Sequence, residues 1–132
     1  MAKKILVVDD EPHIVMLLEG RSKANGYEVL TARDGVTALE MAKNKKPDLI
    51  ILDLMLPKMD GYKVCGLLKK DARFASIPIM IFTARAQDED RTMGEEVGAD
   101  AYITKPFDPP TFINKIRELL IKSSEEPTGR SL

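Results

Sequence analysis

The sequence predicts an α/β fold built on a doubly wound parallel sheet of five strands. Short apolar runs alternate with longer segments that carry apolar residues at helical spacing, and this alternation repeats along the chain. The run from Leu49 to Leu52 has no polar alternation, which is typical of a strand covered by helices on both faces. A repeated strand–helix order favours right-handed crossovers and therefore a parallel sheet.

Caps and turn residues set the expected element boundaries. Pro12 suits a first helical turn, Asn25-Gly26 and Asp34-Gly35 mark turns, and Asp108 is a plausible N-cap. We expect strands at residues 4–8, 27–32, 49–52, 78–82 and 101–104, and helices at residues 12–25, 36–43, 61–70, 88–97 and 109–122. The apolar residues expected to face the sheet are Ile14, Val15, Leu17 and Leu18, then Ala38, Leu39 and Ala42, then Val64, Leu67 and Leu68, and finally Phe112, Ile113, Ile116, Leu119 and Leu120.

Length and charge limit the classes of protein that this chain can represent. The 132 residues suffice for one domain, which we place at residues 1–122, and the polar stretch 123–132 is expected to be a flexible tail or linker. A net charge of −1 provides no broad basic field, so we expect no nucleic-acid contact by this segment. Cys65 is the single cysteine and is expected to be buried, and no apolar run is long enough to span a membrane. We therefore expect a cytoplasmic protein.

Polar and charged residues follow the predicted strands at one edge of the sheet. Asp53 ends the run from Leu49, Asp9-Asp10 follow the first strand, Thr83 follows the fourth and Lys105 follows the fifth. In open α/β sheets, ligands bind outside the carboxyl ends of the strands. These side chains therefore form the candidate site.

The motifs at these strand ends resemble those of the receiver domains of two-component response regulators. The resemblance covers about residues 3 to 122 and is closest to receivers of the winged-helix transcription-factor branch. It implies a flavodoxin-like strand order 2-1-3-4-5 and a cis peptide bond at Lys105-Pro106. The residues that carry it are Asp9-Asp10, Asp53, Pro57, Gly61, Thr83-Ala84 and Lys105-Pro106-Phe107.

The acids of the candidate site are suited to a divalent cation. Carboxylates this close repel one another unless a cation neutralises them, and Mg²⁺ accepts oxygen ligands. The resemblance implies that Asp10 and Asp53 bind Mg²⁺ directly, that Asp9 acts through water, and that the backbone carbonyl of Met55 completes the protein ligands. We therefore expect Mg²⁺ as the cofactor.

The resemblance also implies a signalling switch rather than an enzyme with an external substrate. Asp53 is the expected phosphoacceptor, with a histidine kinase or phosphotransfer protein as donor and slow autodephosphorylation as the return step. Lys105 would stabilise the transferred charge. Thr83 and Tyr102 would pass the signal to a face formed by the helix at 88–97, the strand at 101–104 and the helix at 109–122.

The same face is expected to hold a weak homodimer after activation. Charges of both signs are available on it, but Ala101 and Thr111 stand where the branch tends to carry carboxylates, which removes some ion pairs. Exposed pairs contribute only about 0 to 1 kcal/mol each, so the dimer would be weak. The charges that could pair are Arg91, Glu96 and Asp100 with Lys115, Arg117 and Lys122.

Two other classes of protein remain as alternatives. Aspartate-nucleophile phosphohydrolases usually carry a second Asp two residues after the nucleophile, where this chain has Met55. An FMN-binding electron carrier of the same topology would need a phosphate-binding loop after the first strand, where Asp9-Asp10-Glu11 would repel phosphate. His13, the single histidine, is expected to be a solvated side chain. The sequence leaves open the kinase and whether this receiver stands alone or belongs to a longer regulator.

Overall fold

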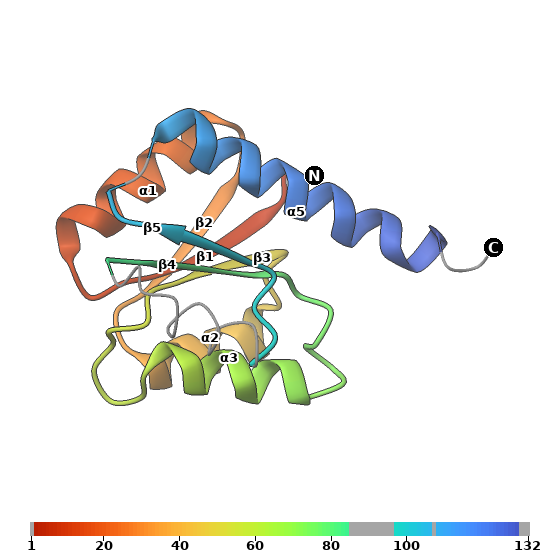
Figure 1. Cartoon of the computed structure of the whole chain (residues 1–132), viewed down its shortest axis with the longest axis horizontal. Coiled ribbons are helices and arrows are strands. Elements are labelled where there is room, and N and C mark those ends of the chain that lie inside the picture. The colour runs from red at the N-terminus through yellow and green to blue at the C-terminus, as the bar shows by residue number, and fades with distance from the viewer. Residues whose placement is uncertain (1, 85–96, 107, 130–132) are drawn as a thin grey trace.

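The five strands form one parallel sheet in the order β2-β1-β3-β4-β5 (Figure 1). The computed structural model describes residues 2–84, 97–106 and 108–129. Both the number of strands and their flavodoxin-like order were predicted, and both are confirmed. The strands are β1 (Lys4–Val8), β2 (Glu28–Ala32), β3 (Leu49–Leu52), β4 (Ile79–Thr83) and β5 (Ala101–Thr104).

Helices cover both faces of the sheet, so the molecule has three layers. Figure 1 shows α1 (Pro12–Ala24) and α5 (Pro109–Gly129) on one face, and α2 (Gly35–Lys45) and α3 (Gly61–Lys70) on the other. The expected helix at 88–97 lies, up to residue 96, outside the described residues. Across the part of the chain that the structure describes, no helix combines the length and apolarity needed to cross a membrane.

Alternate residues of each central strand enter different cores. Ile5 and Val7 of β1 pack in the cluster under α1 and α5, whereas Leu6 and Val8 pack in the cluster under α2 and α3. This two-sided burial explains why the strands read as unbroken apolar runs. Cys65 is fully buried in the second cluster, as predicted, and the five residues expected to anchor α5 are all buried in the first.

Side-chain caps fix the starts of three helices. Asp34 accepts a hydrogen bond from the Thr37 N–H at 2.7 Å, and Asp60 accepts one from the Lys63 N–H at 3.0 Å. The predicted cap Asp108 is confirmed, because its carboxylate accepts from the N–H of Thr111 at 3.2 Å and from its hydroxyl at 2.7 Å. Each cap satisfies an N–H group that the first turn of a helix leaves unpaired.

Two side chains and two helix ends differ from the predictions. Leu17 and Leu67 were expected to face the sheet but are 43% and 42% exposed, because a helix buries one apolar stripe and these side chains lie beyond it. Helix α2 runs to Lys45 rather than 43, and Lys46 ends it with a left-handed φ of 45°.

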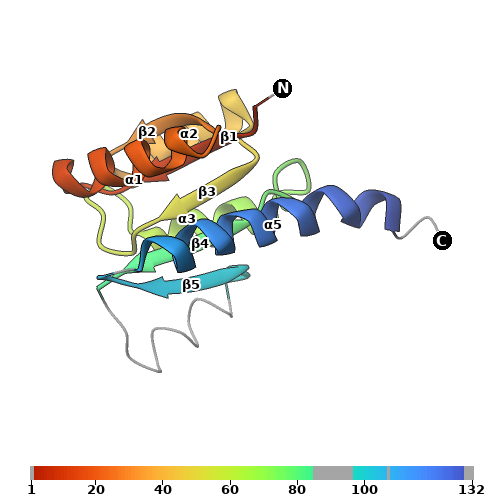
Figure 2. The same cartoon turned by 90° about the horizontal axis from the view of Figure 1, so that it is seen from above.

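Helix α5 continues to Gly129 rather than ending near 122, and Figures 1 and 2 show it extending past the sheet. Extending an existing helix adds one hydrogen bond per ordered residue, and glutamate is a good helix former. The assignment of residues 123–132 as a linker stays a prediction.

A partly buried lysine ties three segments together at the amino edge of the sheet. The ammonium of Lys69 donates to the carbonyl oxygens of Ala75 at 3.1 Å and Ile77 at 2.7 Å, and it forms an ion pair with Asp100 at 2.8 Å. Asp100 also accepts from the Ile79 N–H at 2.8 Å. Helix α3, the segment entering β4 and the segment entering β5 therefore share one polar cluster, which we call the Lys69 clamp.

The start of α3 lies against the backbone that follows β3. The Gly61 N–H donates to the Leu54 carbonyl at 3.0 Å, and a Cβ added at Gly61 would collide with the Asp53 carbonyl oxygen and lie 2.8 Å from the Leu54 Cα. Gly20, in the interior of α1, has open space instead, with nothing within 4 Å of an added Cβ.

We expect Gly61→Ala to lower the free energy of unfolding by about 1–3 kcal/mol, since the backbone must shift to admit the methyl group. Gly20→Ala should raise it by about 0.5–1 kcal/mol, because alanine has the higher helix propensity. Urea unfolding of both variants checks this pair. Equal stability of the two variants would show that α3 does not approach the β3 end as closely as described.

Candidate functional site

The ends of β1, β3, β4 and β5 are held in register at the carboxyl edge of the sheet. Val8 pairs with Leu52, and the N–H of the next residue, Asp53, donates to the Val8 carbonyl at 3.0 Å. On the other side, the Lys105 N–H donates to the Thr83 carbonyl at 2.8 Å. The backbone therefore brings the residues that follow β1, β3 and β5 to one place, as expected for a topological switch point.

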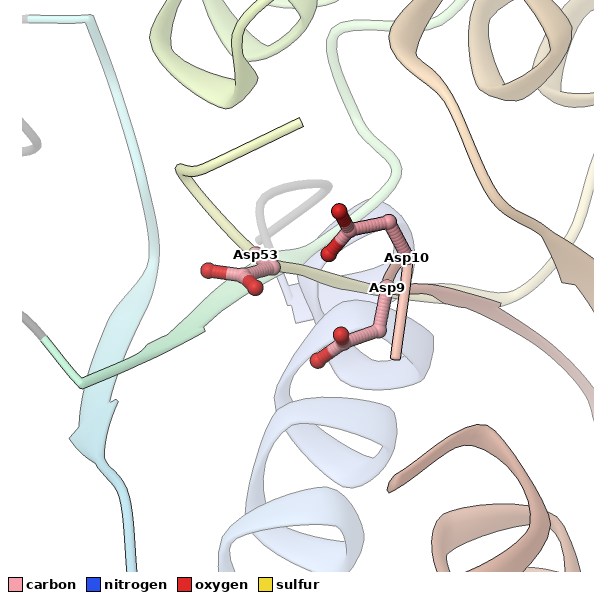
Figure 3. Close-up of side chains that lie close together, drawn as sticks. All are labelled: Asp9, Asp10 and Asp53. Atoms are coloured by element: carbon pink, nitrogen blue, oxygen red, sulfur yellow. The ribbon is translucent and has the colours of Figure 1, made fainter. Parts of the chain in front are cut away.

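Three aspartates meet at this edge. Asp9 and Asp10 come from the end of β1 and Asp53 from the end of β3, and Figure 3 shows their carboxylates gathered together. Each offers a carboxylate oxygen, and these oxygens all lie within 4.8 Å of one another. Asp9 and Asp53 are buried, at 1% and 4% exposure, whereas Asp10 is exposed. The predicted acid cluster therefore forms, with two members below the surface and one open to solvent.

The Lys105 ammonium lies among the carboxylates. Its Nζ is 2.8 Å from Asp9 Oδ2, and it donates to Asp53 Oδ2 and to Glu11 Oε1 at 3.1 Å each. The Phe82 ring lies beneath it, 5.4 Å from Nζ to the ring centre. One positive charge therefore faces three carboxylates, with Asp10 nearby as a fourth, and the site remains acidic.

Burial and neighbouring charges shift the pKa values of Asp9 and Lys105 in opposite directions. Burial raises the pKa of Asp9 above its ordinary value, although Lys105 and the Glu11 N–H, which donates to Asp9 Oδ1 at 3.0 Å, oppose the rise. Burial alone would lower the pKa of Lys105, but contact with Asp9 and the charge of Asp53 outweigh it and raise the pKa. Lys105 is therefore a permanent cation at physiological pH.

The donor set fits a hard divalent cation. Asp9 Oδ2 is buried and, among the described residues, meets no donor at hydrogen-bond angles, since its 2.8 Å approach to Lys105 is an ion pair only. A buried carboxylate oxygen with a lone pair left over, beside two further carboxylates, is a suitable partner for Mg²⁺ or for a water molecule that the ion holds. Asp9, Asp10 and Asp53 together therefore fit the ion that the sequence predicted.

The other predicted residues occupy different places around the same cleft. A cleft of about 830 Å³ is lined by Asp10, Asp53, Met55, Thr83 and Lys105 among others. Thr83 is the last residue of β4 and is fully buried, and the Met55 N–H donates to Asp53 Oδ1 at 3.3 Å. Tyr102, on β5 beside Ile81, is half-buried and does not line this cleft. The Lys105–Pro106 peptide bond is cis, as the resemblance implied.

Sequence reasoning assigned no role to two residues that contact Lys105. Glu11 was noted only as part of an acidic run, and Phe82 only as part of a strand. The position of Glu11 directly after Asp10 was an available signal, whereas the place of Phe82 under the ammonium depends on strand register. His13 lies where predicted, at the surface, with 73% of its side chain exposed.

Fold and site together define a flavodoxin-like α/β protein with an acidic, lysine-containing site at its switch point. Residues 5–117 match the family described as the response regulator receiver domain. The chain belongs to this family.

Relatives support the predicted resemblance to receivers of transcription factors. The chain is 47% identical over 123 residues to the alkaline phosphatase synthesis transcriptional regulatory protein PhoP of Bacillus subtilis, covering 93% of this chain and 50% of that one. It is 43% identical over 124 residues to the DNA-binding dual master transcriptional regulator RpaA of Synechocystis, covering 94% and 52%. The chain thus spans about half the length of these curated relatives.

A solved structure has the same fold. The CheY-like response regulator receiver domain protein from Methanospirillum hungatei superposes with a TM-score of 0.90 at 30% identity, covering 96% of this chain and 99% of that one. The predicted fold class is therefore confirmed by a protein of experimentally determined structure.

We expect Asp9→Asn to stabilise the metal-free protein at neutral pH. Because the pKa of Asp9 is raised above 3.8, the folded state binds this proton more tightly than the unfolded chain does. The resulting stability is present below about pH 3.8 and is lost as pH rises through the folded pKa. The gain from Asp9→Asn should therefore grow from acid to neutral pH in thermal unfolding with a chelator present.

Asp34→Asn is the matched control with the opposite sign. The Thr37 N–H lowers the pKa of Asp34, so its contribution is present at neutral pH and is lost in acid as pH falls from 3.8 through the folded pKa. Asp34→Asn should therefore destabilise at neutral pH. A parallel response of the two variants would contradict the pKa directions assigned here.

Proposed function

We propose that this chain is a phosphorylation-activated switch in which Asp53 accepts a phosphoryl group from a histidine kinase or phosphotransfer protein. The observation that carries the proposal is the placement of Asp53, buried at the floor of the cleft, 3.1 Å from the Lys105 ammonium and beside two further acids. A carboxylate needs little exposure to react if one oxygen opens on the cleft. Membership of the receiver family supports the same role.

The transfer is a substitution at phosphorus. An oxygen of the Asp53 carboxylate forms the new P–O bond, while the bond from phosphorus to the donor breaks and the donor leaves with the electron pair. The product is an acyl phosphate with about 1.5 to 2 negative charges. The Lys105 ammonium, next to Asp53, stabilises charge on the transferred group.

The residues that would hold Mg²⁺ are Asp10 and Asp53 as direct ligands, Asp9 mainly as a charge acting through water, and the backbone carbonyl of Met55. The ion would supply positive charge that neutralises the carboxylates and the incoming phosphoryl oxygens. Receiver domains bind Mg²⁺ at an acidic pocket, and the buried Oδ2 of Asp9 supports the same assignment here.

The signal would leave the site through Thr83 and Tyr102. Thr83 ends β4 at the cleft, and Tyr102 lies on the adjacent strand β5 in register with Ile81. A phosphoryl group that draws the Thr83 hydroxyl would open space toward β5, and Tyr102 would turn inward to fill it. The face that includes β5 and α5 would then change its partners.

A phosphohydrolase remains the weaker candidate. Met55 occupies the position where such enzymes carry the acid that protonates the leaving group, and its side chain is 58% exposed over the cleft. The relatives are transcriptional regulators about twice as long as this chain. We therefore propose a cytoplasmic regulator in which any DNA contact belongs to a region outside this segment.

Acetyl phosphate with Mg²⁺ should add one phosphoryl group to the wild-type chain, visible as a mass increase in intact-mass spectrometry. Asp53→Asn should abolish the increase, since the amide is not a nucleophile here. Asp60→Asn is the matched control, because Asp60 lines the same cleft but caps α3. Labelling of Asp53→Asn at the wild-type level would refute the assignment.

Mg²⁺ binding should depend more on Asp10 than on Asp9. A direct ligand contributes more than a residue that acts through water, so Asp9→Ala should weaken affinity by about 10- to 100-fold, as the loss of an outer-shell partner does, and Asp10→Ala by more. Amide chemical shifts during Mg²⁺ titration measure both. An unchanged affinity in Asp10→Ala would remove it from the ligand set.

We expect a monomer before activation and a weak, salt-sensitive dimer after treatment with beryllofluoride. Three of the predicted charges have partners within the chain: Asp100 pairs with Lys69 at 2.8 Å, Lys115 with Glu118 at 3.5 Å, and Arg117 with Asn25 at 3.1 Å. Arg91 and Glu96 lie outside the described residues. Sedimentation at about 100 μM tests the association. A purely monomeric boundary there would indicate that the same face binds a different protein instead of a second copy of this chain.

A further inference from the structure

Glu11 lies outside the aspartate triad but contacts the same ammonium. Its Oε1 accepts from Lys105 Nζ at 3.1 Å, and its Oε2 lies 3.6 Å from His13 Nε2. The Glu11 N–H donates to Asp9 Oδ1 at 3.0 Å, and its carbonyl accepts from Ile14 and Val15 at 3.1 Å each. The backbone of Glu11 is therefore fixed on both sides, and the side chain reaches Lys105 from a defined point.

Three carboxylate oxygens crowd the Lys105 ammonium, two through hydrogen bonds and that of Asp9 through an ion pair only. An ammonium has three N–H groups, and Nζ has carboxylate oxygens from Asp9, Asp53 and Glu11 at 2.8, 3.1 and 3.1 Å. If Lys105 is to stabilise a transferred phosphoryl group, one carboxylate must withdraw. The identity of that carboxylate decides how easily Lys105 becomes available.

Burial distinguishes the three partners. The side chains of Asp9 and Asp53 are 1% and 5% exposed, so separating either from the ammonium leaves a buried charge unpaired. Glu11 is 48% exposed and its carboxylate can be rehydrated when it withdraws. Glu11 is therefore the partner that exchanges at least cost.

We propose that Glu11 is a positioning residue that holds the Lys105 ammonium at the cleft until a phosphoryl group arrives, and then gives up its place to a phosphoryl oxygen. The inference rests on the proposed function of Asp53 and Lys105. The Glu11–Lys105 contact limits the rate of phosphorylation, because it must break before Lys105 engages the transferred group.

Two substitutions separate this contact from a simple charge effect. Glu11→Gln keeps the length and removes the charge. Glu11→Asp keeps the charge but is one methylene shorter, and aspartate at this N-cap position is favoured to turn toward the free N–H groups of α1, where Glu11 makes no side-chain cap. Both variants should weaken the contact with Lys105, because the glutamine amide offers only a neutral acceptor and the aspartate carboxylate is turned away and shorter. Glu19→Gln, on the same helix and paired with Lys23 at 2.7 Å, controls for the change in net charge.

The experiment measures the rate of labelling by acetyl phosphate at saturating Mg²⁺, followed by intact mass. We expect Glu11→Gln and Glu11→Asp both to react about two- to fivefold faster than wild type, as the loss of a half-exposed ion pair permits, and Glu19→Gln to match wild type. Thermal unfolding of each variant establishes that it is folded.

A faster Glu11→Gln with a wild-type rate in Glu11→Asp would overturn the inference, since charge alone would then explain the change. Unchanged or slower rates in both Glu11 variants would overturn it as well. If wild type itself is not labelled, the proposed function of Asp53 fails, and this outcome is distinct from failure of the role given to Glu11.

Discussion

The contact between the Lys105 ammonium and the carboxylates around it is the interaction on which the site depends. Asp9 and Asp53 are charged groups at the edge of an apolar core, and a charge in that position is stable only when it is paired. Lys105 can pair with both because β4 holds its backbone in place through the Thr83 carbonyl. The sheet register thus places the ion-paired groups next to one another as well as packing the core.

This arrangement leaves the site with more negative than positive charge. The excess negative charge lowers the stability of the fold but suits the proposed function. Burial raises the pKa of Asp9, so the folded chain carries an unfavourable charge at neutral pH. The same unfavourable charge attracts a divalent cation, which would neutralise the carboxylates. Stability and the proposed reactivity are therefore opposed at this edge of the sheet, as is common at functional sites.

The layers of the fold could be predicted from the sequence because strands buried on two faces appear as unbroken apolar runs. Cap residues such as Asp108 also mark where helices begin. The strand order was predicted from the family resemblance, because local sequence patterns do not determine which strands are neighbours. The exposure of Leu17 and the length of α5 were missed, since helical spacing alone does not reveal where an apolar stripe ends or how far a nucleated helix continues. At the site, strand ends identified the residues that meet, but the contact of Glu11 with Lys105 depends on side-chain reach across 94 positions of sequence.

The Lys69 clamp gives the molecule a fixed end opposite the site. It joins α3 to the segments that enter β4 and β5 at the amino edge of the sheet, whereas Thr83 and Lys105 lie at the carboxyl edge of the same strands. Because the starts of β4 and β5 are tied through Asp100 and the Ile79 N–H, the clamp would resist sliding of these strands along their length during a displacement that begins at Thr83. If Asp53 is phosphorylated as proposed, β4 and β5 would therefore tilt about the Lys69 clamp, with the largest movement at the cleft and the smallest at the amino edge of the sheet.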